Sequence, residues 1–192
     1  MSLLEKSFPS NTNFRVRLFI LHSLNSLLPP DIRIKSAEEV PLTFHAQYSA
    51  TGKIYHYNMN FDAVMNPFQR LYCLHVYEKT DLSLLKQAAN IFLGTHDFTS
   101  FANEAHKGCA AHDAIRTIQR IDLVTHDKGI RLEFEADGFL YKMVRNIVGT
   151  LLEVAQSKRP LEQIANIIAA KDRRKAGQAA PPHGLFLFKV HY

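Results

Sequence analysis

The sequence predicts an α+β fold in which an antiparallel or mixed sheet carries its helices on one face. Residues 115–126 and 130–136 alternate apolar and polar side chains around Asp127-Lys128-Gly129, which is typical of a β-hairpin. Two helical segments and a final strand, Leu185 to Val190, follow this hairpin. The order strand, strand, helix, helix, strand favours helices packed on one side of an antiparallel sheet.

The two helical segments differ in character. The first, from about Phe139 to Gln156, is apolar on nearly every side, so we expect it to be buried. The second opens at Pro160, a residue suited to the first turn of a helix, and extends to about Ala170.

The beginning of the chain predicts one helix and one short strand. Apolar residues at helical spacing predict a helix from about Phe14 to Leu28, which Pro29-Pro30 ends. Asp31 to Lys35 is a candidate strand. Nothing in Met1 to Asn13 indicates a regular element.

The middle of the chain predicts a long strand and a helix. Residues 44–61 alternate in character and indicate a long strand or a bent hairpin. A helix is expected from Asp81, as its N-cap, to Leu93, and a loop over residues 95–114. We expect a partial N-terminal subdomain, residues 1–93, and a C-terminal subdomain, residues 94–192, that share one continuous sheet.

The composition is that of a globular protein with a modest excess of positive charge. Of the 192 residues, 46% are hydrophobic and 21% charged, which argues against disorder. A net charge of +5 and a pI of about 9.2 favour an anionic partner such as RNA over a neutral metabolite. Two cysteines, no long apolar stretch and no secretory signal lead us to expect a cytoplasmic protein without a membrane span.

Arg145 lies inside the apolar helix. Arg145 has Val148, Gly149 and Leu152 as neighbours at helical spacing. An arginine in such surroundings is costly unless a carboxylate or phosphate meets it. The structural alternatives are a side chain that reaches water, or an ion pair with a local glutamate: Glu133, Glu135 or Glu153.

A series of segments, in the same order along the chain, resembles the TruA-type tRNA pseudouridine synthases. These segments are Leu24 to Ile32, Phe44-His45-Ala46, Lys53-Ile54-Tyr55-His56-Tyr57, Gly94 to Phe101, Arg116-Thr117-Ile118, Gly138 to Gly149, Lys171-Asp172-Arg173 and Ala179 to Leu185. Each segment alone is a weak signal. Together they cover nearly the whole chain from about Asn25, and their common order makes the resemblance specific.

The resemblance implies an enzyme that isomerises uridine to pseudouridine in the anticodon stem-loop of tRNA, without cofactor or metal. The family's essential group is an aspartate in a Gly-Arg-Thr-Asp segment, which can act as nucleophile or base at the glycosidic carbon. At the matching positions Tyr55 would stack on the flipped uracil and Leu185 would pack against it. Arg145 would take the catalytic role of pairing with the aspartate. The family acts as a homodimer, so tRNA and a second copy are the expected partners.

The chain departs from the family at this essential group. No aspartate of the 192 residues follows Arg-Thr, and the family's segment precedes the helix expected at Phe14 to Leu28. We therefore expect an incomplete N-terminal half, apolar surface where strands would pair, and no catalysis by this chain alone. The alternatives are a non-catalytic RNA-binding remnant and an α+β domain with only salt-sensitive attraction for RNA.

Several polar residues remain as weaker candidates. The residues assigned to RNA binding are His45, Lys107, Arg116, Lys142 and Arg173, and the alternative is scattered solvated charge.

His106, Cys109 and His112 could be metal ligands, but no fourth ligand is evident, so no metal is expected. Asp97 is interpreted as a carboxylate that caps its own loop. Tyr55 has the alternative of an ordinary packing residue in a strand.

Overall fold

The computed structural model describes residues 12–103, 113–126 and 129–192. The chain forms two compact units, Met1–His45 and Ala46–Tyr192, each described here by itself. The subdomain boundary expected at residue 93 stays a prediction, although strands from both sides of it join one sheet. Within the described ranges, no helix has the length and apolar character needed to cross a membrane.

The first unit contains helix α1, Thr12–Leu27, close to the expected helix. The expected strand at Asp31 to Lys35 is wrong, because these residues form a turn and irregular backbone. The cause is Asn25: its amide donates to the Ile34 carbonyl at 2.9 Å, and its Oδ1 accepts from the Ile34 N–H at 2.8 Å. These two bonds occupy the groups that a strand would need for pairing.

The second unit is built on a six-stranded mixed sheet in the order β2-β1-β5-β4-β3, with β6 also paired to β1. The strands are β1 Gly52–Asn60, β2 Leu74–His75, β3 Gly94–Asp97, β4 Ile115–His126, β5 Gly129–Ala136 and β6 Leu185–His191. Among the described strands, β1 and β2 are the one pair that runs in parallel. The predicted β4–β5 hairpin and the final strand are confirmed.

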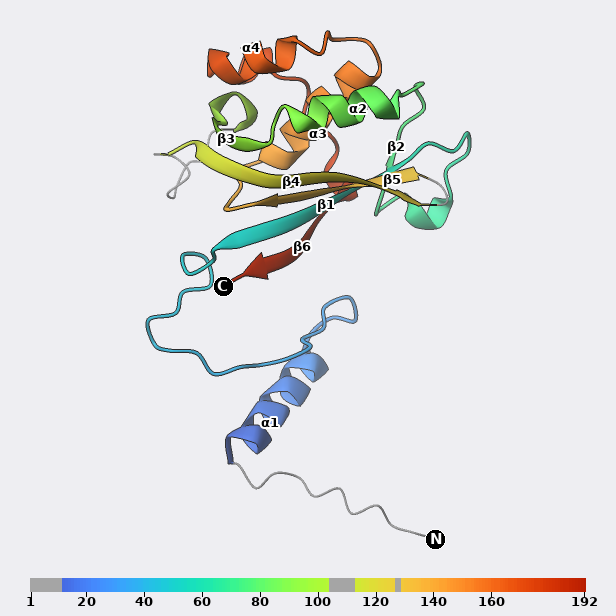
Figure 1. The fold of residues 1–192 in the computed structure, drawn as a ribbon. Helices are drawn as coiled ribbons and strands as arrows, with labels where there is room; N and C mark the ends of the chain where they lie inside the picture. Colours follow the sequence, from blue (N-terminus) through green and yellow to red (C-terminus); the bar gives the residue numbers. More distant parts are fainter. Residues whose placement is uncertain (1–11, 104–112, 127–128) are drawn as a thin grey trace. The chain divides into compact units, whose positions relative to one another are not determined.

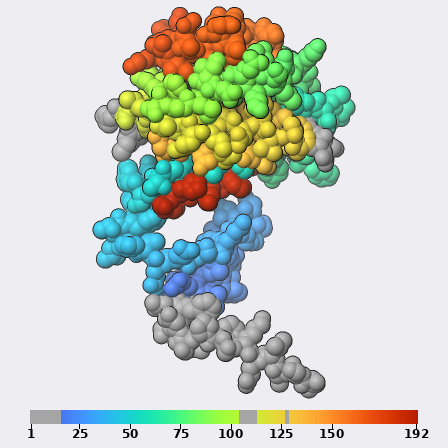
Figure 2. Space-filling view, in the orientation of Figure 1, coloured from blue at the N-terminus to red at the C-terminus, as the bar shows by residue number. Residues whose placement is uncertain are grey.

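Helices α2, Leu82–Asn90, α3, Met143–Ala155, and α4, Gln163–Ala170, cover one face of this sheet (Figure 1). In the space-filling view they form a layer above the yellow surface of β4 and β5 (Figure 2). The core lies between the layers, where Tyr57, Phe134 and Leu132 of the sheet meet Met143, Ile147 and Leu151 of α3. The predicted fold class and the buried character of α3 are confirmed.

The boundaries of several elements differ from the expected ones for local reasons. Strand β1 covers residues 52–60 of the expected 44–61. Helix α3 begins at Met143, later than the expected Phe139, because Lys142 adopts a left-handed φ of 59°. The segment expected as a loop contains β3, which pairs with β4 from Gly94 to Asp97. Asp81 caps α2 as predicted, accepting from the N–H groups of Ser83 and Leu84.

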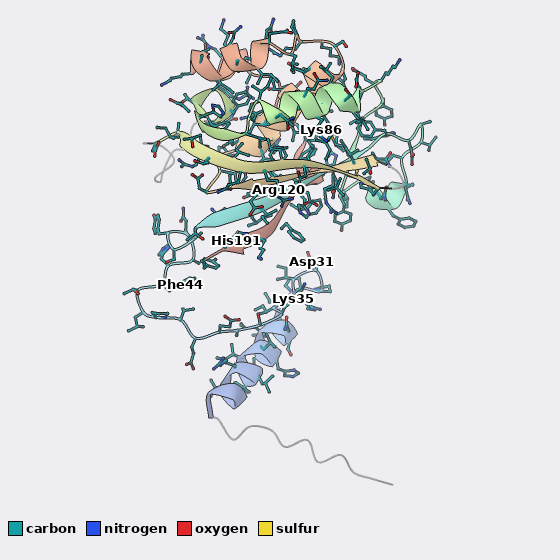
Figure 3. All side chains as sticks on the ribbon, viewed as in Figure 1. Asp31, Lys35, Phe44, Lys86, Arg120 and His191 are labelled. Carbon is teal, nitrogen blue, oxygen red and sulfur yellow. The ribbon has the colours of Figure 1, made fainter. Side chains whose placement is uncertain are left out.

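The face of the sheet opposite the helices carries a network of paired charges. Arg120 of β4 bonds to Glu133 and Glu135 of β5 at 3.2 and 3.0 Å, and Arg131 contacts Glu133 at 2.6 Å. His191 of β6 lies 3.9 Å from Glu135; Arg120 and His191 are labelled in Figure 3. These carboxylates are therefore neutralised within the sheet.

Candidate active site

Helix α3 supplies the central charged side chain of the site. Arg145 is half-buried on this helix, and its Nε donates to the main-chain carbonyl of Ala180 at 2.6 Å. In return the Ala180 N–H donates to the Arg145 carbonyl at 2.9 Å. The two bonds join α3 to the segment just before β6 and restrict where the guanidinium can lie.

The two terminal nitrogens of Arg145 have no hydrogen-bond or ion-pair partner among the residues that the structure describes. The local-glutamate alternative is wrong in this part of the chain, because each glutamate has other cations. Glu133 and Glu135 bond to Arg120, and Glu153 bonds to Arg159 at 2.7 Å. The site therefore presents a half-buried cation that lacks a carboxylate, and such a group favours an anionic partner.

Tyr55 lies on β1, on the helix-covered face of the sheet. Its ring meets Phe139 edge to face, with ring centroids 5.1 Å apart and planes at 83°. The side chain is half-buried, and burial raises the pKa of its hydroxyl. Phe139 precedes α3, so Tyr55 packs against the turn that leads into the helix carrying Arg145. Packing and a role in binding a base are compatible here.

Leu185 opens β6 and lies opposite Tyr57 of β1 in the strand register. It is half-buried and packs against the core. Tyr57 is fully buried, and its hydroxyl donates to the Pro181 carbonyl at 2.8 Å. Burial raises the pKa of Tyr57 although the nearby Arg145 opposes this shift, so the hydroxyl stays a donor. Leu185 and Arg145 are thus joined through Tyr57 and the segment 180–185.

Two of the predicted RNA-binding residues lie beside the turn that precedes α3. A Cβ built on Gly138 would lie 3.3 Å from Nε of Arg116, so that side chain lies against the turn. Lys142 ends the turn, with its Nζ 5.3 Å from the ring centroid of Tyr141. Phe139, the neighbour of Tyr55, belongs to the same turn. Arg116 and Lys142 therefore place positive charge on the turn against which Tyr55 packs.

Of the other predicted RNA-binding residues, Arg173 is the one that the structure describes within the second unit. Arg173 uses its guanidinium internally, on Asn146 Oδ1 at 2.8 Å and on the Gly177 carbonyl at 3.0 Å, and burial lowers its pKa. His45 belongs to the first unit. Lys107 lies outside the described residues, as do the candidate metal ligands His106, Cys109 and His112.

Sequence reasoning missed three polar residues that shape the site: Tyr57, Asn146 and Thr150. Asn146 and Thr150 are completely buried on α3, where they and Glu153 are the polar residues that accompany Arg145 among apolar ones. That pattern was visible in the sequence. The role of Tyr57 was not, because its partner Pro181 is 124 residues away in the chain.

Asp97 has the local role that the sequence indicates. Its Oδ1 accepts from the N–H and the hydroxyl of Thr99 at 3.0 and 2.6 Å, and Lys171 lies 2.8 Å from Oδ2. These contacts lower the pKa of Asp97 to about 2. Among the described residues no three acidic, histidine or cysteine side chains cluster as a metal site would require.

The fold and the site define an α+β protein with a half-buried cation on α3 and an aromatic side chain that packs against the turn before α3, suited to an anionic and aromatic ligand. A family model described as tRNA pseudouridine synthase matches residues 88–192, more than half of the chain. The chain belongs to this family.

Similar proteins share most of the chain. It is 61% identical over 170 residues to "tRNA pseudouridine synthase A 1" of Protochlamydia amoebophila, covering 88% of this chain and 66% of that protein. It is 43% identical to "tRNA pseudouridine synthase A" of a Geobacillus species over 88% of this chain and 67% of the relative. A Lactobacillus helveticus protein of the same name is 39% identical over 97% of this chain and 68% of its own length. The chain thus spans about two thirds of the length of these relatives.

Proposed function

We propose that the second unit forms one side of the uridine pocket of a tRNA pseudouridine synthase. The observation that carries this proposal is Arg145, which is half-buried, held by Ala180 and left with two terminal nitrogens that bind no described residue. Tyr55 and Leu185 supply the aromatic and apolar contacts for a base. The tRNA pseudouridine synthase family of the chain supports this reading.

The proposed reaction breaks the bond from the ribose C1′ to N1 of uracil and forms a bond from C1′ to C5, after which the proton on C5 leaves and N1 takes up a proton. Arg145 pairs with the carboxylate of the family's Arg-Thr-Asp segment and keeps it ionised beside the glycosidic carbon. The Tyr55 ring supports the extruded uracil, and Leu185 limits the space in which the base turns. Arg116 and Lys142 contact phosphates of the flipped strand.

The 192 residues contain no Arg-Thr-Asp segment, so we propose that this chain alone does not catalyse the isomerisation. The proposed substrate is the anticodon stem-loop of tRNA, the proposed assembly is a homodimer, and the proposed compartment is the cytoplasm. The names of the relatives and the basic net charge support the tRNA part of this proposal.

The test is release of tritium from tRNA that carries 5-tritiated uridine, because the C5 proton leaves only when the new bond forms. The chain is assayed alone and after addition of a polypeptide with the Gly-Arg-Thr-Asp segment. No release alone and release on addition are the expected results. Release from the chain alone would mean that one of its own acids acts, and tRNA binding without release in either assay would favour the non-catalytic alternative.

A further inference from the structure

The segment Ala176 to Pro181, called the strap below, runs across one face of α3. The helix positions that contact it are Arg145, Gly149, Thr150 and Glu153, which share a face at helical spacing. A Cβ on Gly149 would lie 1.8 Å from the Gln178 carbonyl oxygen, so the strap rests directly on the helix backbone. Such close approach is possible only because position 149 has no side chain.

Buried side chains fix both ends of the strap. At its start, the Gly177 N–H donates to the Thr150 hydroxyl at 2.9 Å, and Arg173 bridges Asn146 and the Gly177 carbonyl. At its end, the Tyr57 hydroxyl donates to the Pro181 carbonyl at 2.8 Å. Between these points the strap presents the Ala180 carbonyl to Nε of Arg145. The acceptor that holds Arg145 is therefore fixed by Thr150 and Tyr57.

This contact decides how Arg145 can meet an anion. A guanidinium has five N–H donors and can bind a carboxylate through its end, with Nη1 and Nη2, or through its side, with Nε and Nη2. Because Nε is bonded to Ala180, the side-on geometry is closed and the end-on geometry remains.

We propose that the strap is a positioning device that presents Arg145 end-on to its anionic partner, and that Tyr57 and Thr150 are its positioning residues. The proposal rests on the function proposed for Arg145, but the orientation is a property of the chain alone. A side chain that is already held in its binding orientation loses less conformational entropy when the partner binds.

The test is the NMR signal of the Arg145 Nε–H group, whose exchange with solvent can be measured in the isolated chain. We expect slow exchange in the wild type. Tyr57→Phe and Thr150→Val should each accelerate it about ten-fold, the effect of losing one hydrogen bond of ordinary strength. Thr150→Ser keeps the hydroxyl and should exchange as the wild type does. Tyr77→Phe alters an exposed tyrosine and should also have no effect.

The Nε–H of Arg120 is the internal reference. It bonds to Glu135 at 3.0 Å on the face of the sheet opposite the helices, and its exchange rate should be the same in all variants. Wild-type exchange as fast as that of a solvated arginine would overturn the proposal without any variant. So would unchanged Arg145 exchange in a folded Tyr57→Phe or Thr150→Val chain. Because no activity is measured, failure of the proposed isomerase function and failure of the strap proposal remain distinguishable.

Discussion

At the scale of single residues, the sequence led to Arg145 because a charge in an apolar helix needs a partner. The structure shows where part of that partner lies, namely the carbonyl of Ala180. Sequence patterns could not predict this contact, because a main-chain acceptor 35 residues away carries no signature of its own. The neighbouring polar residues Asn146 and Thr150 were predictable from the same pattern and were missed.

A substitution of Tyr55 tests the proposed stacking role. Tyr55→Phe keeps the ring and should keep tRNA affinity, whereas Tyr55→Leu should weaken binding by about 1–3 kcal/mol, the usual value of one base stacked on an aromatic side chain. The measurement is tRNA binding at one fixed salt concentration. Tyr77→Leu, at an exposed tyrosine, serves as control, and equal affinities of the Tyr55→Leu and Tyr77→Leu chains would contradict the stacking role.

Asp97 offers a test of a structural residue within a family motif. Its pKa is lowered from 3.8 to about 2, so its contribution to stability is complete above pH 4 and is lost as the pH falls toward 2. Asp97→Asn should reduce the free energy of unfolding by about 1 kcal/mol at pH 7, as for loss of a cap. In denaturant titrations, the difference in the free energy of unfolding between the wild type and Asp97→Asn should become smaller from pH 4 to pH 2. A difference that stays constant over that range would show that the ionised carboxylate is not what stabilises the loop.

Among the helices and strands, the alternation of apolar and polar residues predicted β4, β5 and β6 well, and the N-cap at Asp81 predicted α2. Strand β3 was not predicted, because its four residues lie in a segment rich in Gly and His and depend on pairing with β4. The strand expected at 31–35 failed because Asn25 occupies the polar groups of Ile34. In both cases a contact distant in sequence decided the local structure.

Close contact between α3 and the strap predicts that Gly149 tolerates no side chain. Gly149→Ala improves intrinsic helix propensity by about 1 kcal/mol. The added Cβ would however meet the Gln178 carbonyl, which is main chain and cannot rotate away. We expect a net loss of about 1–3 kcal/mol in the free energy of unfolding. Gly52→Ala is the matched control, since its Cβ would lie an ordinary 3.4 Å from the Ala136 carbonyl oxygen; equal stability of both variants would contradict the close contact.

His56 lies on the face of the sheet opposite the helices, and we expect it to make the free energy of unfolding depend on pH. This side chain is buried under Phe188, with ring centroids 4.0 Å apart. Burial lowers its pKa below the ordinary 6.5, although Glu133 opposes the shift. The unfolded chain therefore binds the proton more readily, and stability from this group is lost as the pH falls below about 6.5.

His56→Phe keeps a ring against Phe188 and removes the titration. Between pH 8 and pH 5, its free energy of unfolding should fall less steeply than that of the wild type. His126→Phe, at an exposed histidine on β4, should keep the wild-type slope. Parallel curves for the wild type and His56→Phe would show that His56 does not contribute to the pH dependence.

At the scale of the whole molecule, the fold class and the family followed from the order of elements and segments. The described strands of the second unit form one sheet with helices on one face, and the site lies between α3, the strap and the strands β1 and β6. The sequence could not predict the arrangement in which the two terminal nitrogens of Arg145 bond to no residue that the structure describes. That arrangement arises from contacts between segments far apart in the chain.

In the proposed function, Arg145 pairs with a carboxylate at the reacting uridine. The most direct measurement is the single-turnover rate of tritium release from 5-tritiated-uridine tRNA, with the Gly-Arg-Thr-Asp segment supplied, for the wild type and for Arg145→Ala. We expect a loss of about 100-fold or more, as for removal of one charged stabilising group, with tRNA binding largely retained. An unchanged rate in Arg145→Ala would show that Arg145 does not pair with the reacting carboxylate.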